Sequence, residues 1–393
     1  MRHSLVTFPV VIICVSIALI SLRKQFVSFY VGRLFSMSAT PTYEKELRVA
    51  TLAVKRASIL TKQLSDSIAQ AEQGTITKED KSPVTIGDFA SQAIINHALS
   101  ANFPQDEIVG EEDSQDLRDN SKLADQVLDL ISKVQSETLE YSESLGDLQD
   151  KQSVFKSIDL GNSKGGSKGR FWALDPIDGT KGFLRGDQFA VCLALIEDGK
   201  VVLGVIGCPN LARNIESNTK QSGTIGGLYS AVKGLGSYYA PLFDSGFTEL
   251  AQQQRIEMKQ HYSPQDLKVV EGVEKGHSSH STQAAIKAKL GFDPETVAEK
   301  TINLDSQVKY CVLASGQADI YLRLPINDVY REKIWDHAAG NILVYEAGGR
   351  VGDIQGKPLD FGKGRLLPSQ GVIASNNRVF DKVIDAVKSV CNL

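Results

Sequence analysis

The sequence predicts a protein of two domains, in which an α+β half is followed by an α/β half. Its 393 residues are enough for two domains, and 42% hydrophobic with 23% charged residues is ordinary for a globular protein. Two apolar runs, at residues 189–196 and 201–206, are joined by the turn sequence Glu197–Lys200, which is typical of an antiparallel hairpin. Beyond residue 259, short strand patterns alternate with helical ones. We therefore expect domains at residues 38–258 and 259–393.

The charge and the cysteines exclude several classes of protein. A formal net charge of −4 gives no indication of a nucleic-acid partner. The five cysteines are odd in number and irregularly spaced, and none forms a C-x-x-C pair. This pattern argues against a disulfide framework or a zinc site, and it favours a reducing compartment. A monomer is expected.

The N-terminal residues 1–37 differ from the rest, because they are basic and contain neither Asp nor Glu. Residues 5–22 form an almost unbroken apolar run, which is marginal in length for one transmembrane helix. Three interpretations remain open: a mitochondrial presequence, a signal anchor, and a dispensable extension before an alternative start at Met37. The expected location is accordingly cytoplasmic or mitochondrial, with membrane attachment only if this segment is an anchor.

Helices are predicted for most of the chain before residue 160. An amphipathic helix is expected at residues 43–73, where apolar side chains recur every three or four positions. A second helical pattern opens at Asp88, a candidate N-cap, and ends near Asn102. Residues 116–160 are polar and favour helix, so an added helical segment is expected at the side of the first domain.

The most informative stretch is D-P-I-D-G-T, which follows the apolar strand predicted at residues 171–174. Its proline and glycine are turn residues, so Asp175 and Asp178 are expected on a tight turn at the end of a strand. Carboxylates with a backbone carbonyl form an oxygen site that suits Mg²⁺ better than zinc. Free N–H groups at a turn leading into a helix suit a phosphate oxygen. Alone, the motif is also compatible with an ordinary surface turn.

A second acidic cluster, Gly110–Glu111–Glu112, follows a short apolar strand. Glu111 is favoured as a metal ligand because it directly follows the strand and the glycine, although a solvated acidic turn has the same composition. Far along the chain, the sequence W-D-H-A-A-G opens a helix with Asp336 at its start.

Four separated clusters now stand in order: Gly87–Asp88, Gly110–Glu112, Asp175–Thr180 and Trp335–Gly340. Together they resemble the lithium-sensitive, magnesium-dependent phosphatase superfamily that includes inositol monophosphatase and fructose-1,6-bisphosphatase. The resemblance covers the chain from about Tyr43 to its end. It implies a two-domain layered αβαβα sandwich and inhibition by Li⁺ in place of one Mg²⁺.

Within the superfamily, residues 273–280, 304–310 and 321–325 are most similar to the 3′(2′),5′-bisphosphate nucleotidases. This resemblance implies Mg²⁺-dependent hydrolysis of the 3′ phosphate of 3′-phosphoadenosine 5′-phosphate to AMP and phosphate, in support of sulfate assimilation. It implies the related 5′-phosphosulfate as a second substrate. The alternatives are an inositol polyphosphate 1-phosphatase, an inositol monophosphatase and, from another class, a nucleotide-binding sensor with vestigial activity.

The resemblance also implies roles for individual residues. Two or three Mg²⁺ ions would be held by Glu111, Asp175, the carbonyl of Ile177, Asp178 and Asp336. The attacking water would be oriented and deprotonated by Asp88 and Thr180. The small-molecule nucleotide would be bound by Gly179, Thr180, His277, Ser306, Lys309, Arg323 and Glu332. Because no ligand is missing, an active enzyme is expected.

Overall fold

The computed structural model describes residues 43–72, 82–274, 279–325, 327 and 329–393. The predicted extension at residues 1–37 and the predicted substrate residue His277 therefore lie outside the described residues. Among the helices in these ranges, none has both the length and the apolar character that crossing a bilayer requires.

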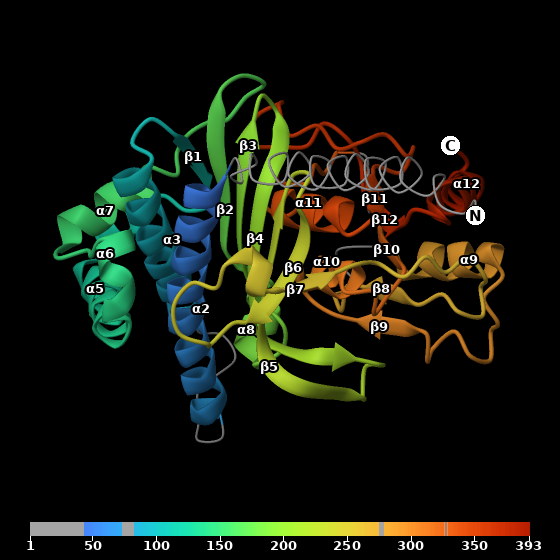
Figure 1. The fold of residues 1–393 in the computed structure, drawn as a ribbon, viewed down its shortest axis with the longest axis horizontal. Coiled ribbons are helices and arrows are strands. Elements are labelled where there is room, and N and C mark those ends of the chain that lie inside the picture. Colours follow the sequence, from blue (N-terminus) through green and yellow to red (C-terminus); the bar gives the residue numbers. More distant parts are fainter. Residues whose placement is uncertain (1–42, 73–81, 275–278, 326, 328) are drawn as a thin grey trace, which may run out of the picture. The chain divides into compact units, whose positions relative to one another are not determined.

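Helices and sheets alternate in five layers within residues 45–393, which form one compact unit (Figure 1). The two sheets form the second and fourth layers. The helices of the first, third and fifth layers are, in pairs, α2 (Glu44–Glu72) with α3 (Ser82–Asn102), α10 (Val308–Ala314) with α11 (Ala338–Glu346), and α9 (His280–Leu290) with α12 (Phe380–Cys391). This is the αβαβα sandwich that the resemblance to the phosphatase superfamily implies.

The first sheet has seven strands in chain order, and only its first pair, β1 with β2, is parallel. The predicted hairpin is confirmed, with Asp198 and Gly199 at positive φ in the turn between β3 and β4. The strands of this sheet are β1 (Glu107–Gly110), β2 (Arg170–Asp178), β3 (Ala190–Glu197), β4 (Lys200–Ile215), β5 (Gln221–Val232), β6 (Gly236–Pro241) and β7 (Gln254–Ile256).

The second sheet has five strands in the order β11-β12-β10-β8-β9. Its β10, β8 and β9 are parallel, whereas β12 runs antiparallel to both of its neighbours. The strands are β8 (Val269–Glu271), β9 (Thr301–Asn303), β10 (Ile320–Arg323), β11 (Gly349–Gly352) and β12 (Val372–Asn376). A domain boundary near residue 258 would fall in the connection between the two sheets, and it remains a proposal.

Close packing on both faces of β4 holds the first three layers together. A Cβ atom on Gly204 would lie 3.0 Å from the Cα of Ala339 in α11, and one on Gly207 would lie 2.2 Å from the Oγ of Ser58 in α2. Because residues three apart on a strand point to opposite faces, the two glycines admit one helix layer on each side of the sheet.

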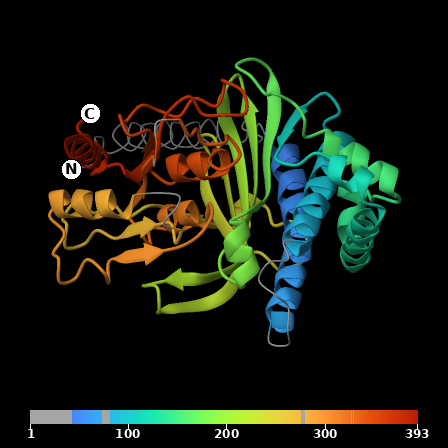
Figure 2. The ribbon, with the colours of Figure 1, turned by 180° about the vertical axis from the view of Figure 1, so that it is seen from behind.

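The predicted helical segment after residue 116 is confirmed and packs outside α3 (Figure 2). It comprises α4 (Gln115–Asp119), α5 (Ser121–Glu137), η1 (Leu139–Tyr141), α6 (Ser142–Leu145) and α7 (Lys151–Asp159). Arg56 of α2 fastens this insert, since its side chain is only 1% exposed and donates to Thr138, Ser142, Gly146 and Asp147 at 2.9–3.1 Å.

The prediction that Asp88 caps a helix is wrong. Helix α3 begins at Ser82, so Asp88 lies in its second turn. A proline at the second helical position is compatible with a helix start, because the N–H groups of the first turn have no partner within the helix. Val84 and Ile86 are buried, so tertiary packing extends the helix towards its N-terminus.

Three cysteines, Cys192, Cys208 and Cys311, are buried as free thiols in the core between the first sheet and α10. The sulfur atoms of Cys208 and Cys311 are 3.6 Å apart. Burial raises the pKa of the Cys192 and Cys311 thiols well above their ordinary value, so both are protonated at neutral pH.

Candidate active site

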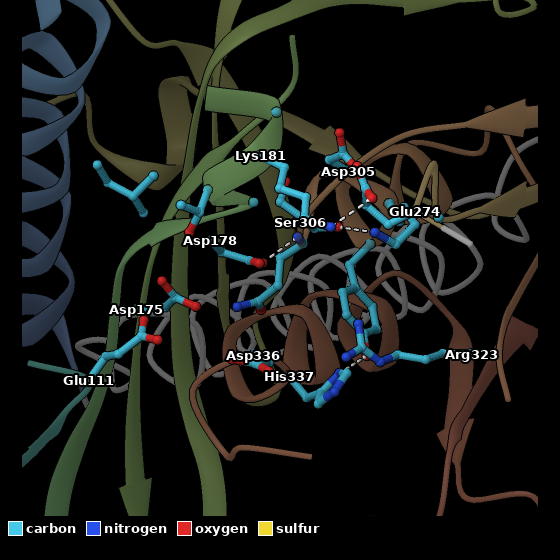
Figure 3. A pocket seen from close by; sticks show the side chains of 18 of the residues that line it. Glu111, Asp175, Asp178, Lys181, Glu274, Asp305, Ser306, Arg323, Asp336 and His337 are labelled. Carbon is cyan, nitrogen blue, oxygen red and sulfur yellow. Dashed lines mark hydrogen bonds and ion pairs between the residues drawn. The ribbon is translucent and has the colours of Figure 1, made fainter. Parts of the chain in front are cut away.

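A cavity of about 590 Å³ lies where the end of β2, α8 (Thr180–Arg185) and the segments before α10 and α11 meet (Figure 3). Its lining contains nearly all the predicted site residues. They are Asp88, Glu111, Asp175, Ile177, Asp178, Gly179, Thr180, Ser306, Lys309, Arg323 and Asp336. Glu332 lies behind Arg323 rather than in the lining, and His277 is not described.

A bulge in β2 brings Asp175 and Asp178 to the same cavity. The two residues pair with Cys192 and Ala190 of β3, so three steps along β2 correspond to two along its neighbour. On a regular strand, side chains three positions apart point to opposite faces, and the extra residue of a bulge cancels that difference. The predicted turn is therefore replaced by an irregular strand that continues through Asp178.

The loop after this strand needs a glycine for two reasons. Gly179 has a φ of +91°, a left-handed conformation that other residues seldom adopt. A Cβ atom there would lie 2.9 Å from the Cβ of Ser306. The beginning of α8 is consequently in direct contact with the segment that leads into α10.

The carboxyl groups of the cavity are hard to ionise together. Burial, followed by the charges of Glu111 and Asp178, raises the pKa of Asp175 well above its usual range, and burial has the same effect on Asp336. Burial and the charges of Glu112 and Asp178 raise the pKa of Glu111 to about 7. For Asp88, burial and the two neighbouring glutamates raise the pKa. The folded protein thus concentrates negative charge that needs protons or cations.

The residues present fit a hard cation. Oδ1 of Asp175 and Oδ1 of Asp88 are buried without a hydrogen-bond partner, which is costly for a carboxylate oxygen. The donors that converge on the cavity are carboxylate oxygens, the ligands preferred by Mg²⁺ and similar ions. Among the described residues, the acidic cluster is therefore the place where a metal would relieve an electrostatic cost.

A tighter set, Glu332, Asp336 and His337, has possible ligand atoms within 4.8 Å of one another. Two of its members already have partners. Oε1 of Glu332 accepts from Arg323 Nε at 2.7 Å, and its Oε2 lies 3.2 Å from Nε2 of His337. This leaves only Asp336 of the three for a metal.

Arg323 lies on the opposite side of the cavity from Glu111 and Asp175 (Figure 3). Lys309 is buried, and its ammonium group donates to the carbonyls of Leu304 at 3.2 Å and Ser306 at 2.6 Å. Burial lowers the pKa of Lys309 to about 8, with the charge of Asp178 acting in the other direction. The charge of Arg323 also lowers the pKa of Lys309, so the two cations lie near each other.

Gln307 is a buried link that the sequence did not indicate. Its backbone N–H donates to Oδ2 of Asp178 at 2.6 Å, and its side-chain amide donates to the carbonyl of Trp335 at 2.8 Å. Its side-chain oxygen accepts from the N–H of Gly340 at 2.9 Å. One residue thus ties Asp178 to the backbone on both sides of Asp336.

An ion-pair network at the cavity edge was also missed. Glu274 accepts from Lys181 at 2.9 Å and from Arg185 at 2.8 Å, and Arg185 also pairs with Asp305. Charged residues in a loop carry no sign of their partners when those lie about 90–120 positions away along the chain.

The layered fold and a cavity that contains both carboxyl groups and cations define a class of protein. The comparison with known protein families agrees with this class. Residues 43–391 match the family described as "Inositol monophosphatase family", so the chain belongs to that family. The family predicted from the four sequence clusters is confirmed.

Relatives from fungi and plants are named more specifically. The chain is 75% identical over 352 residues to "3′(2′),5′-bisphosphate nucleotidase 1" of Candida albicans. The matched region covers 89% of this chain and 97% of that protein. It is 48% identical to the 3′(2′),5′-bisphosphate nucleotidase of Emericella nidulans, covering 90% and 100% of the two chains. The protein of that name from Oryza sativa is 40% identical, over 90% and 96%.

Solved structures agree on the fold. An inositol monophosphatase from Zymomonas mobilis matches 88% of this chain and 99% of its own, with a TM-score of 0.52 and 20% identity. An inositol monophosphatase from Thermotoga maritima matches 88% and 98%, with the same TM-score and identity.

Proposed function

We propose that the protein is a magnesium-dependent phosphatase that removes the 3′ phosphate of 3′-phosphoadenosine 5′-phosphate, giving AMP and phosphate. The observation that carries this proposal is that one cavity contains the carboxyl groups of Glu111 and Asp175 and, on the side away from them, the guanidinium of Arg323 (Figure 3). A substrate with two phosphates has one group for each side. The names of the fungal and plant relatives support the same activity.

In this proposal two or three Mg²⁺ ions are held by Glu111, Asp175, Asp178, Asp336 and the carbonyl of Ile177. When bound, such ions lower the pKa of a water molecule and neutralise charge on the phosphate and the leaving oxygen.

Asp88 and Thr180 are the proposed pair that orients the water and accepts its proton. Both line the cavity, and burial together with Glu112 and Glu111 raises the pKa of Asp88, which makes its carboxylate a stronger base. The N–H groups of Gly179 and Thr180 hold the phosphate that reacts, at the point where α8 begins.

The phosphate that does not react is assigned to Lys309 and Arg323. A guanidinium binds phosphate through paired hydrogen bonds, and a buried ammonium adds a point charge. Ser306 and His277 complete the proposed nucleotide pocket, whereas Glu332 acts through Arg323. In the cell, the reaction would remove a by-product of sulfate assimilation, and the 5′-phosphosulfate would be a second substrate.

Phosphate release from 3′-phosphoadenosine 5′-phosphate by the full chain, with and without Mg²⁺, tests this function. We expect release that depends on Mg²⁺, with AMP as the other product. Release from inositol phosphates instead would retain the metal site and overturn the assignment of the substrate. A protein that binds the nucleotide without releasing phosphate would be a sensor.

Stabilisation by Mg²⁺ is expected to increase with pH. The folded, metal-free protein keeps a proton on Glu111 between its ordinary pKa of 4.5 and about 7, where the unfolded chain does not. Its stability therefore falls as the pH rises through this window, and a cation that binds the ionised carboxylates restores it. Thermal unfolding with and without Mg²⁺ should show a larger shift at about pH 7.5 than at about pH 5.5. Equal shifts would contradict the proposed ligands.

A further inference from the structure

A chain of buried hydrogen bonds connects Tyr310 and His337, which line the cavity, to Arg323 through Glu332. The hydroxyl of Tyr310 lies 2.7 Å from Nδ1 of His337, and Nε2 of that ring lies 3.2 Å from Oε2 of Glu332. The other oxygen of Glu332 accepts from Nε of Arg323 at 2.7 Å. Tyr310, His337 and Glu332 are each at most 4% exposed, so the bonds are shielded from water.

The direction of every bond follows from the charge of Glu332. Burial alone would raise its pKa, but the hydrogen bond from His337 and the positive charge of Arg323 lower it to about 2. An ionised carboxylate only accepts, so His337 donates from Nε2, and the neutral ring then accepts on Nδ1. Tyr310 must then donate. The chain has one consistent arrangement, running from Tyr310 through His337 to Glu332.

This arrangement fixes one edge of a guanidinium that lines the cavity. Arg323 ends β10, and Glu332 belongs to a different segment, just before α11. The carboxylate holds Nε, and His337 in turn holds the carboxylate, so the orientation of the guanidinium is set before any ligand arrives. A pre-oriented arginine binds a phosphate group with less loss of rotational freedom than a mobile one.

We propose that Tyr310 and His337 are positioning residues for Arg323, and that through it they set the preference for nucleotides with a second phosphate. This inference rests on the proposed function and extends it. Tyr310 and His337 border the cavity, but neither belongs to the proposed metal ligands or to the pair that activates the water. Their loss should therefore weaken discrimination between substrates more than it weakens the reaction itself.

His337→Leu removes both hydrogen bonds of the imidazole, whereas His337→Gln keeps an N–H donor for Glu332. For each full-length protein, kcat/KM is measured for 3′-phosphoadenosine 5′-phosphate and for adenosine 3′-phosphate, which lacks the second phosphate. We expect His337→Leu to lower the ratio of the two values about tenfold, as for the loss of one hydrogen bond to a charged group. His337→Gln and Tyr310→Phe should fall between His337→Leu and the wild type. His97→Leu is the control, because His97 lies next to Gly146 and does not line the cavity. This substitution should leave the ratio unchanged.

A merely structural role for His337 would lower both kcat/KM values equally, and an unchanged ratio would overturn the proposal. Binding of AMP without metal gives a second readout that needs no turnover. If the wild type binds AMP more tightly than His337→Leu but releases no phosphate, the positioning role stands and the proposed reaction fails. Equal AMP affinity in the two proteins would overturn the positioning role whatever the reaction.

Discussion

Asp175→Asn should lower turnover by more than about 100-fold, because even the outer partners of metal ligands cost 10–100-fold when they are removed. The same change should not weaken the metal-free fold. Burial and four neighbouring carboxylates raise the pKa of Asp175, and its Oδ1 has no hydrogen-bond partner, so the charge is unfavourable without a cation. We expect the metal-free thermal midpoint at neutral pH to equal or exceed that of the wild type.

The measurement pairs phosphate release with thermal unfolding, each with and without Mg²⁺. Asp385→Asn is the matched control, since Asp385 is an exposed residue on α12 and does not line the cavity. It should behave as the wild type in both assays. If Asp175→Asn lost its activity together with its metal-free stability, Asp175 would be a structural residue and the proposed ligand set would be wrong.

Arg56→Met should reduce the free energy of unfolding by about 3–5 kcal/mol, the usual effect of removing one partner of a buried ion pair. Methionine fills much of the same volume but removes the donor from the carbonyls of Thr138 and Gly146, and it leaves Asp147 with the hydroxyl of Ser142 in place of a cation. Because these groups belong to the insert between α3 and β2, the insert should detach before the layered core unfolds. Urea unfolding followed by circular dichroism measures the change.

Arg48→Met is the control for this change, on the same helix. Arg48 is exposed and contacts the ring of Phe247, with 5.4 Å from its guanidinium carbon to the ring centroid. Such an exposed contact contributes at most about 1 kcal/mol. Similar losses for the two variants would show that α2 responds to any loss of charge rather than to the buried network at Arg56.

Local patterns in the sequence predicted much of the fold. The periodicity before residue 73, the polar helical segment after residue 116 and the turn at Glu197–Lys200 each depend on neighbours close along the chain. The limits of α3 were missed, because Val84 and Ile86 gain their stability from burial against distant residues. The bulge at Asp175 was missed for a similar reason, since it is defined by the register of β3.

In the site, too, the residues within local motifs could be predicted, and those defined by contacts between distant segments could not. The resemblance of four clusters to a known superfamily predicted that Asp88, Glu111, Asp175 and Asp336 share one site. The structure places them in one cavity. Gln307 and the network around Glu274 depend on contacts between segments far apart, so nothing local distinguishes them. His337 was visible beside Asp336, but its partners Tyr310 and Glu332 could not be assigned without distances.

The three buried thiols have a use that does not involve catalysis. Cys192 and Cys208 lie on β3 and β4, and Cys311 lies on α10, the helix that also carries Lys309. A thiol reagent reaches these sulfurs only when α10 separates from the sheet, so the rate of their modification measures how often this wall of the cavity opens. Cys391, which is partly exposed on α12, reacts without such an opening and calibrates the reagent within the same molecule. Peptide mass spectrometry separates the positions, and the native cysteines thereby report the opening of the cavity without an added label.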